Sequence, residues 1–287
     1  MKRVSIYIKL IVILIIFLLI TFFVEGQGKT DLADKIITIS SFVFGIILAF
    51  SIANRHSRLS IIREKLREQD AILEESYLLA KKLNKNVLNN LRKKIDEFLI
   101  IQIDYKLKDF SKETPKKLKE LFVFIENIKP RTKAQENVAS KLLDNFSDLL
   151  KINEEVSYQT DNQMASYEWI SLIVLSGIIF FSLIFYFNTN TLISTIIIAV
   201  LCTTFTLLLL VLRDLDKLEW QENNWIWKPL STLFTNLDLL PYFPKAVFTQ
   251  NRLKLKNFME FKKIRVATYP NFYPDFDGKK VKIVNLK

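Results

Sequence analysis

Four stretches of almost uninterrupted apolar residues stand out along the chain, at 5–24, 36–53, 169–187 and 191–212. Each is close to the roughly 20 residues that a helix needs to cross the hydrocarbon core of a bilayer. Lys9 lies near the start of the first stretch, and the central parts of all four carry no charge. A charged side chain at the centre of a spanning helix costs about 2.5–3.5 kcal/mol on insertion scales. The pattern therefore predicts four transmembrane helices.

Between the second and third stretches, apolar residues recur at three-, four- and seven-residue steps, which is the period of one helix face. They are Leu59, Ile62, Leu66, Leu73, Tyr77, Ala80, Val87, Leu91, Ile95 and Phe98. No Pro or Gly occurs between Gly45 and Pro115. We therefore expect the second span to continue as one helix through 59–108, a length of about 75 Å at 1.5 Å per residue. Such a stripe needs a partner helix or another subunit to cover it.

Two further helix starts follow in the same region. Thr114 before Pro115 is typical of an N-cap with Pro at the first helical position, and it predicts a short helix that ends near Ile128. Thr132 followed by Gln135 forms a capping-box pattern. The returning helix then carries an apolar stripe of Val138, Leu142, Phe146, Leu149 and Val156. The predicted arrangement is a pair of long helices, out and back, with a shorter helix at the tip.

The last 75 residues change from helical to alternating periodicity. Pro229 begins a short helix whose apolar residues are Leu230, Leu233, Phe234 and Leu237. Farther on, Ile264, Val266 and Thr268 alternate with polar residues, as do Val281 and Ile283. Asp277-Gly278 supplies a turn signal. This pattern predicts a β-hairpin.

These elements predict an all-α membrane protein. It has four transmembrane helices, a long cytoplasmic helical hairpin between the second and third, and a small cytoplasmic C-terminal tail with a β-hairpin. The expected parts are 1–53 with spans 5–24 and 36–53, the cytoplasmic helical domain 54–166, 167–212 with spans 169–187 and 191–212, and the tail 213–287.

The distribution of charge gives the expected orientation. The 287-residue chain has 41 Lys and Arg against 30 Asp and Glu, a net charge of +11. Of these bases, 22 lie in 54–166 and 14 in 213–287, whereas the 188–190 link has none. Cytoplasmic loops are the ones rich in Lys and Arg. We therefore expect a multi-pass protein of the inner (plasma) membrane with both termini in the cytoplasm.

The first apolar stretch has a second interpretation, as a signal peptide. Its basic start and apolar core fit that class of segment. Val24 is followed by Glu25-Gly26-Gln27-Gly28, however, which is not an A-x-A-like cleavage site. The stretch is also long for the core of a signal peptide, so an uncleaved anchor is favoured.

Composition excludes several classes of function. One His and one Cys cannot form a His/Cys metal cluster, and no metal or cofactor is expected. The chain lacks a phosphate-binding Gly loop, a G-x-S-x-G elbow and an H-E-x-x-H motif, so we expect no enzyme. The 22 bases of 54–166 are mixed with 18 acids, which indicates a solvated surface and no nucleic-acid partner. Spans without ionisable residues favour a passive channel or an anchor over a pump.

The second span contains the candidate site. Small residues recur every four positions at Ser41, Gly45, Ala49 and Ala53. This spacing lets helices approach closely, so a helix-packing seam is the favoured interpretation, and a pore wall is the alternative.

The end of the same span supplies candidate residues of a cytoplasmic mouth, Asn54 and the cations Arg55 and Arg58. If several subunits surrounded one axis, these residues would attract anions. Ordinary contact with lipid phosphates is the simpler interpretation.

After the fourth span, an acidic group is interleaved with Arg213 and Lys217. Its members are Asp214, Asp216, Glu219 and Glu222. This pattern favours charge balance over a divalent cation site.

A group of residues around the second span resembles the bestrophin-like membrane family, as does the order of two spans, a long helical insert, two spans and a tail. The residues are Gly45, Leu48, Ala49, Phe50, Asn54, Arg55, Arg58 and Glu64. The resemblance implies a pentameric anion or cation channel whose pore is lined by the second span, with Ser41 and Gly45 near the axis or one helical face away from it. The sequence departs from such channels at Leu59-Ser60, where they have a tryptophan pair, and after the last span.

Two functions therefore stay open. One is a homo-oligomeric passive ion channel in the lipid bilayer. The other is a non-conducting membrane anchor or sensor whose cytoplasmic helices bind a protein partner.

Overall fold

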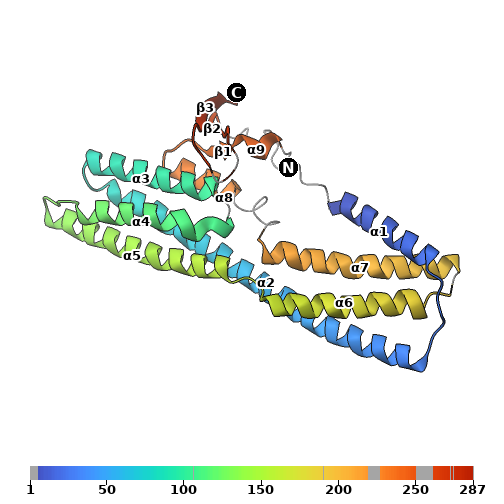
Figure 1. Ribbon diagram of the computed structural model, residues 1–287. Coiled ribbons are helices and arrows are strands. Elements are labelled where there is room, and N and C mark those ends of the chain that lie inside the picture. The colour runs from blue at the N-terminus through green and yellow to red at the C-terminus, as the bar shows by residue number, and fades with distance from the viewer. Residues whose placement is uncertain are drawn as a thin grey trace. The chain divides into compact units, whose positions relative to one another are not determined.

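The computed structural model describes residues 6–105, 107–189, 191–218, 227–249, 261–271, 273 and 275–286 (Figure 1). It is 76% helical, with a small sheet near the C-terminus. The elements are α1 (Ile6–Phe23), α2 (Asp31–Ala80), α3 (Lys85–Asp104), the 3-10 turn η1 (Leu107–Asp109), α4 (Phe110–Glu126), α5 (Lys133–Asp161), α6 (Ser166–Tyr186), α7 (Leu192–Asp216), α8 (Trp227–Asn236), β1 (Tyr242–Pro244), α9 (Lys245–Thr249), β2 (Lys263–Thr268) and β3 (Lys280–Asn285). They form two compact units, Met1–Ser57 with Gln163–Glu219, and Arg58–Asn162 with Trp220–Lys287.

Unit 1 contains α1, the first part of α2, α6 and α7. Among the described residues of the whole chain, three helical segments are long and apolar enough to cross a membrane by length and composition: Asp31–Ala80, Lys133–Tyr186, which contains α5 and α6, and Leu192–Asp216. Ile8–Phe23 forms a shorter apolar helix. Large apolar side chains cover much of the outer surface of this unit, including Ile15, Phe22, Phe42, Ile173 and Ile197. A surface of this kind fits contact with lipid better than contact with water.

The core of unit 1 joins α2 to α6 and α7. Phe44 and Leu48 of α2 are buried with Leu172 and Ile179 of α6 and Cys202 of α7. The rings of Phe44 and Phe205 meet edge to face, with 5.3 Å between their centroids. The single cysteine therefore serves as a small core residue.

Asn188, in the link between α6 and α7, binds the C-terminal end of α1. Its side-chain amide donates to the carbonyl oxygens of Thr21 and Val24, at 2.9 and 3.1 Å. The last carbonyls of a helix have no partner within that helix, so Asn188 satisfies the end of α1. The backbone N–H of Gln27 also donates to the carbonyl of Phe185 at 2.7 Å. This connection was not expected from the sequence, where the link contained no distinctive signal.

In unit 2, the expected single helix through 59–108 is wrong. Helix α2 ends at Ala80, and α3 begins at Lys85 after a short turn. Asn84 causes the new start: its backbone is extended, with ψ at 157°, and its side chain accepts the N–H of Val87 at 2.9 Å. An Asn in this position caps a helix as well as a Ser or Thr does.

Helix α3 folds back along α2. The side-chain amides of Gln69 and Gln102 exchange hydrogen bonds of 3.1 and 2.9 Å, so residues on either side of the turn lie opposite each other. The apolar stripe of the sequence is buried between these helices and their neighbours: Leu73, Tyr77, Ala80, Leu91, Ile95 and Phe98 are all in one core cluster.

The N-termini of α4 and α5 can be compared with the two helix starts predicted from the sequence. The start at Pro115 is wrong, because α4 begins at Phe110 and contains Pro115. The proline lies near the N-terminal end of the helix, where only one backbone hydrogen bond is lost. The start at Thr132 is confirmed: the Thr132 hydroxyl accepts the N–H of Gln135 at 3.3 Å. The Gln135 side chain accepts the N–H of Arg131 at 2.9 Å.

Helix α5 lies antiparallel to the second half of α2. Asn145 donates to Glu75 at 3.0 Å, and Lys65 lies 3.3 Å from Glu155. The predicted stripe of α5 faces the core, where Leu142, Phe146, Leu149 and Val156 are buried.

The sheet has the order β1-β2-β3. The predicted hairpin is confirmed, with β2 and β3 antiparallel and Ile264 opposite Val284. Strand β1, parallel to β2, was missed, since three residues are too few to show a period. The predicted residues Leu230, Leu233 and Phe234 of α8 are buried, as is Leu237 directly after the helix.

Acidic side chains of α3 hold the sheet. Arg265 of β2 makes two hydrogen bonds with Asp96, at 2.7 and 2.6 Å. The Asp104 carboxylate accepts from the hydroxyls of Tyr242 and Tyr269 and from Lys279 Nζ. Its side chain is only 3% exposed, so three donors compensate for its burial.

Gly26 gives a testable consequence of the link in unit 1. A Cβ at this position would lie 1.8 Å from the carbonyl oxygen of Asn188, which is a backbone atom. We expect Gly26→Ala to lower the free energy of unfolding by about 1–3 kcal/mol through this clash. The measurement is thermal unfolding of the protein in detergent micelles.

Gly177→Ala is the matched control, because a Cβ there meets no atom within 4 Å. Within a helix, this change is expected to be neutral or to stabilise by up to about 1 kcal/mol. Equal effects of the two substitutions would contradict the described packing of Gly26.

Candidate functional site

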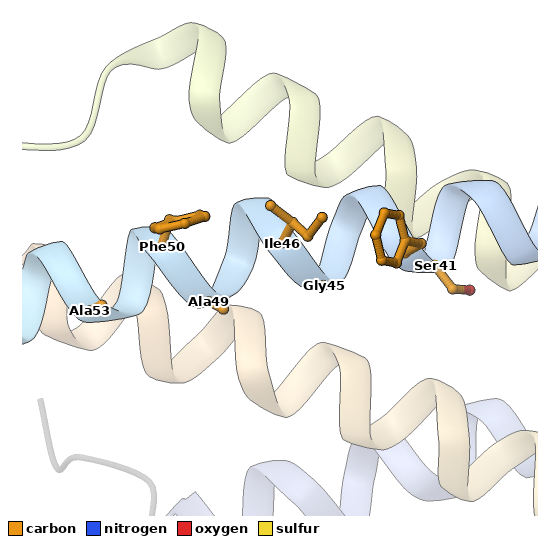
Figure 2. Close-up of a pocket in the computed structure, with 7 residues that line it drawn as sticks. Ser41, Gly45, Ile46, Ala49, Phe50 and Ala53 are labelled. Carbon is orange, nitrogen blue, oxygen red and sulfur yellow. The ribbon is translucent and has the colours of Figure 1, made fainter.

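The small residues predicted from the sequence lie on one face of α2 and line a shallow groove of about 600 Å³. The lining residues are Ser41, Phe42, Gly45, Ile46, Ala49, Phe50 and Ala53, all from this helix. In Figure 2, the large side chains of Ile46 and Phe50 extend from one edge of the helix, whereas Ala49 presents only a methyl group and Gly45 has no side chain. The groove exists because residues with little or no side chain recur every four positions next to bulky ones.

No described part of unit 1 covers this groove. Gly45, Ala49 and Ala53 are exposed, and a Cβ added to Gly45 would meet no atom within 4 Å. The neighbouring Phe44 and Leu48, by contrast, are 1% and 5% exposed. Gly45, Ala49 and Ala53 are therefore left uncovered by the described residues of this unit, and Ser41 is partly exposed. What remains for them is contact with another subunit, lipid or water.

The three residues at the end of the predicted span have different surroundings. Asn54 is exposed. Arg55 reaches Asp216 at the end of α7, with Nη1 3.4 Å from Oδ1. The same carboxylate oxygen accepts the backbone N–H of Met164 at 2.8 Å. Asp216 therefore joins α2, α7 and the segment before α6, and the side chains of the ion pair are only 13% and 6% exposed.

Arg58 belongs to unit 2 and is 4% exposed. Its Nε and Nη2 donate to the carbonyl oxygens of Gln159 and Thr160, the latter at 2.7 Å. Both carbonyls are in the last turn of α5, where backbone oxygens lack helical partners and a cation is favourable. The planar guanidinium suits two neighbouring acceptors. Arg58 thus has local partners in unit 2 besides any role toward ions or lipid.

The acidic group after α7 shows charge balance where it is described. Arg213 lies 3.2 Å from Asp214, and Asp216 pairs with Arg55. Glu219 and Glu222 lie outside the described residues. Within the described ranges, no three His, Cys, Asp or Glu side chains come together in a way that could hold a metal ion.

A second concave surface lies in unit 2, between α2 and α8, with a volume of about 400 Å³. Its lining includes Asp70, Glu74, Pro229, Thr232 and Asn236. Asn236 donates to Glu74 at 3.1 Å. Burial, and to a lesser degree the Glu74 carboxylate, raises the pKa of Asp70 from 3.8 to about 7. Sequence reasoning missed this site, because Asp70 is one of many acids on a mixed helix surface.

The apolar helices of unit 1, with their lipid-compatible outer surface, define a membrane protein. A family model, the Bestrophin-like domain, matches residues 8–217, which is most of the chain. The chain belongs to the bestrophin-like family, as the residues around the second span indicated. No curated protein and no solved structure matches it.

A substitution that breaks the Arg55–Asp216 pair is expected to lower the stability of the protein strongly. Arg55→Met leaves the buried Asp216 carboxylate without this cation, and we expect a loss of about 3–5 kcal/mol in stability. In the Arg55→Met/Asp216→Asn double variant, the amide oxygen can still accept from Met164, so part of the loss should be recovered. The measurement is thermal unfolding in detergent of the natural protein, Arg55→Met, Asp216→Asn and the double variant. Together they give the coupling energy of the pair. Strictly additive losses would show that the pair does not interact.

Asp70 predicts a pH dependence. Because its folded-state pKa is raised to about 7, its contribution to stability is fully present below about pH 4 and is lost as the pH rises through 7. Asp70→Asn keeps residue 70 neutral at every pH, beside an unchanged Glu74. We expect the variant to melt at a higher temperature than the natural protein at pH 8, with a much smaller difference at pH 5.

The control is Asp144→Asn, which alters an exposed carboxylate of α5. Its melting temperature should differ from that of the natural protein by the same amount at both pH values. The assignment to Asp70 fails if the two variants behave alike.

Proposed function

We propose that this protein is a subunit of a homo-oligomeric passive ion channel in the inner (plasma) membrane. The observation that carries the proposal is the uncovered face of small residues on α2, in a chain of the bestrophin-like family. In this proposal, Ser41, Gly45, Ala49 and Ala53 of each subunit line the pore or the contact between subunits beside it.

The proposed topology has four spans, at 5–24, 36–53, 169–187 and 191–212. Both termini, the helical domain 54–166 and the tail 213–287 lie in the cytoplasm. The excess of Lys and Arg in these two parts supports this orientation, because such residues are retained on the cytoplasmic side. The part of the chain on the other side of the membrane is then very small.

The chemistry of the groove suits passive conduction. Its residues offer one hydroxyl and several small apolar groups but no ionisable side chain. A coupled pump needs ionisable groups within the bilayer, whereas a passive pore needs only width and an accessible wall. At the cytoplasmic mouth, we propose that Asn54 faces the ion path. Arg55 and Arg58, through Asp216 and the end of α5, set the exit direction of α2 and contribute positive charge.

A non-conducting anchor or sensor is the second candidate. It is favoured by the separate core of unit 2, whose helices and sheet make a domain large enough to bind a protein partner. In that case, the uncovered face of α2 would contact lipid or a second subunit and never water.

The deciding experiment is reconstitution. The expected result is an oligomer larger than a dimer in detergent, by light scattering, and discrete current steps in planar bilayers. A monomer or dimer with electrically silent bilayers would reject the channel and leave the anchor.

Cysteine substitution tests the α2 face itself. In a Cys202→Ala background, which removes the only native thiol, Ala49→Cys should lose current several-fold on reaction with a water-soluble cationic thiol reagent. Val43→Cys, on another face of α2, is the matched control and should keep its current. Equal loss of current in both variants would contradict a pore wall at Ala49.

A further inference from the structure

Strand β3 is an edge strand with exposed side chains along its whole length. All six of its residues pair with β2, from Lys280 opposite Thr268 to Asn285 opposite Lys263. All six are also exposed, and the described residues include no further strand beyond β3. Its outer edge is therefore open to solvent in the described part of unit 2.

The hydrogen-bond pattern shows which backbone groups face outward. The N–H of Leu286 donates to the carbonyl of Lys262 at 3.1 Å, which makes this a directly bonded pair. Such pairs alternate along an antiparallel ladder, so residues 280, 282 and 284 bond to β2. The N–H and C=O groups of Val281, Ile283 and Asn285 consequently point away from β2. The N–H of Arg265, opposite Ile283, agrees with this register, since it donates to Pro241 on the other side.

The side chains of β3 alternate between two faces of the strand, one with Val281, Ile283 and Asn285 and the other with Lys280, Lys282 and Val284. Val281 and Ile283 project from one face of the strand and are 46% and 62% exposed. Lys280 and Lys282 project from the opposite face, because successive side chains alternate. A row of exposed apolar residues and a row of ammonium groups thus follow the same open edge.

This combination of groups selects among partners. Two β3 edges paired with each other would bring lysines from both copies together, and like charges on neighbouring strands are destabilising. A strand with Glu or Asp on one face and apolar residues on the other would match both rows. Its backbone would satisfy the outward N–H and C=O groups.

We propose that the outer edge of β3 binds an extended acidic segment of another protein, which adds to the sheet as a fourth strand. Lys280 and Lys282 pair with its carboxylates, and Val281 and Ile283 pack against its apolar residues. This surface is independent of the groove on α2, so it can serve a channel or an anchor.

The test uses the full-length protein in detergent and a fluorescein-labelled peptide of alternating Glu and Val with blocked ends. Fluorescence anisotropy should show saturable binding that weakens as salt is added. A Lys/Val peptide of the same length should bind at least about tenfold more weakly. An alternating peptide with N-methylated Val should also lose binding, because it cannot donate to the strand edge.

Two variants locate the binding site. Ile283→Pro removes an outward N–H and no bond to β2, and Pro is tolerated on edge strands in this orientation. It should weaken binding about tenfold or more while thermal unfolding stays cooperative. Lys280→Glu/Lys282→Glu should exchange the preference, so that the Lys/Val peptide binds better than the Glu/Val peptide.

Three results would overturn the proposal. The first is unchanged affinity of both variants for the Glu/Val peptide. The second is absence of saturable binding by the natural protein. The third is a smaller oligomer for Ile283→Pro, which would mean that the edge pairs with a second copy. None of these results depends on whether the protein conducts ions.

Discussion

Helix α2 carries two different surface patterns along one continuous helix. Within the bilayer, its backbone must bond to itself and its surface must be apolar on every side. Beyond Arg58, the same helix has one apolar face and one charged face, and it packs by the rules of a water-soluble bundle. Because Asp31–Ala80 is one continuous helix, it contributes to the core of both units. The other face of α2 packs against neighbouring helices, and this packing holds the exposed small-residue face in place.

The ends of the helices are held by a few polar side chains. Asn188 binds the last carbonyls of α1, and Arg58 binds those of α5. Asp216 neutralises Arg55 and accepts a backbone N–H ahead of α6. Each of these side chains is almost completely buried, so each donor or acceptor replaces water that cannot reach the site. Apolar packing makes the helices associate, while these hydrogen bonds satisfy backbone groups at or near the helix ends.

Much of this architecture could be predicted because periodicity is local. The apolar stretches, the helix faces from Leu59 to Phe98 and from Leu142 to Val156, and the β2–β3 alternation are all visible in short windows. The break at Asn84 was missed because its neighbours continue the helical period on both sides. The Arg55–Asp216 pair could not be predicted, since 161 residues separate its members. The uncovered state of the Ala49 face also needed the fold, because spacing alone is the same in a packed seam and an open groove.

The Asp104 network has a consequence for the order of synthesis. Its carboxylate lies on α3, but its donors Tyr242, Tyr269 and Lys279 come at least 138 residues later in the chain. While the ribosome is still making α5 to α7, the Asp104 carboxylate lacks these three donors and is solvated by water. The Asp104 site is therefore completed only after the residues of β2 and those that lead into β3 have been made.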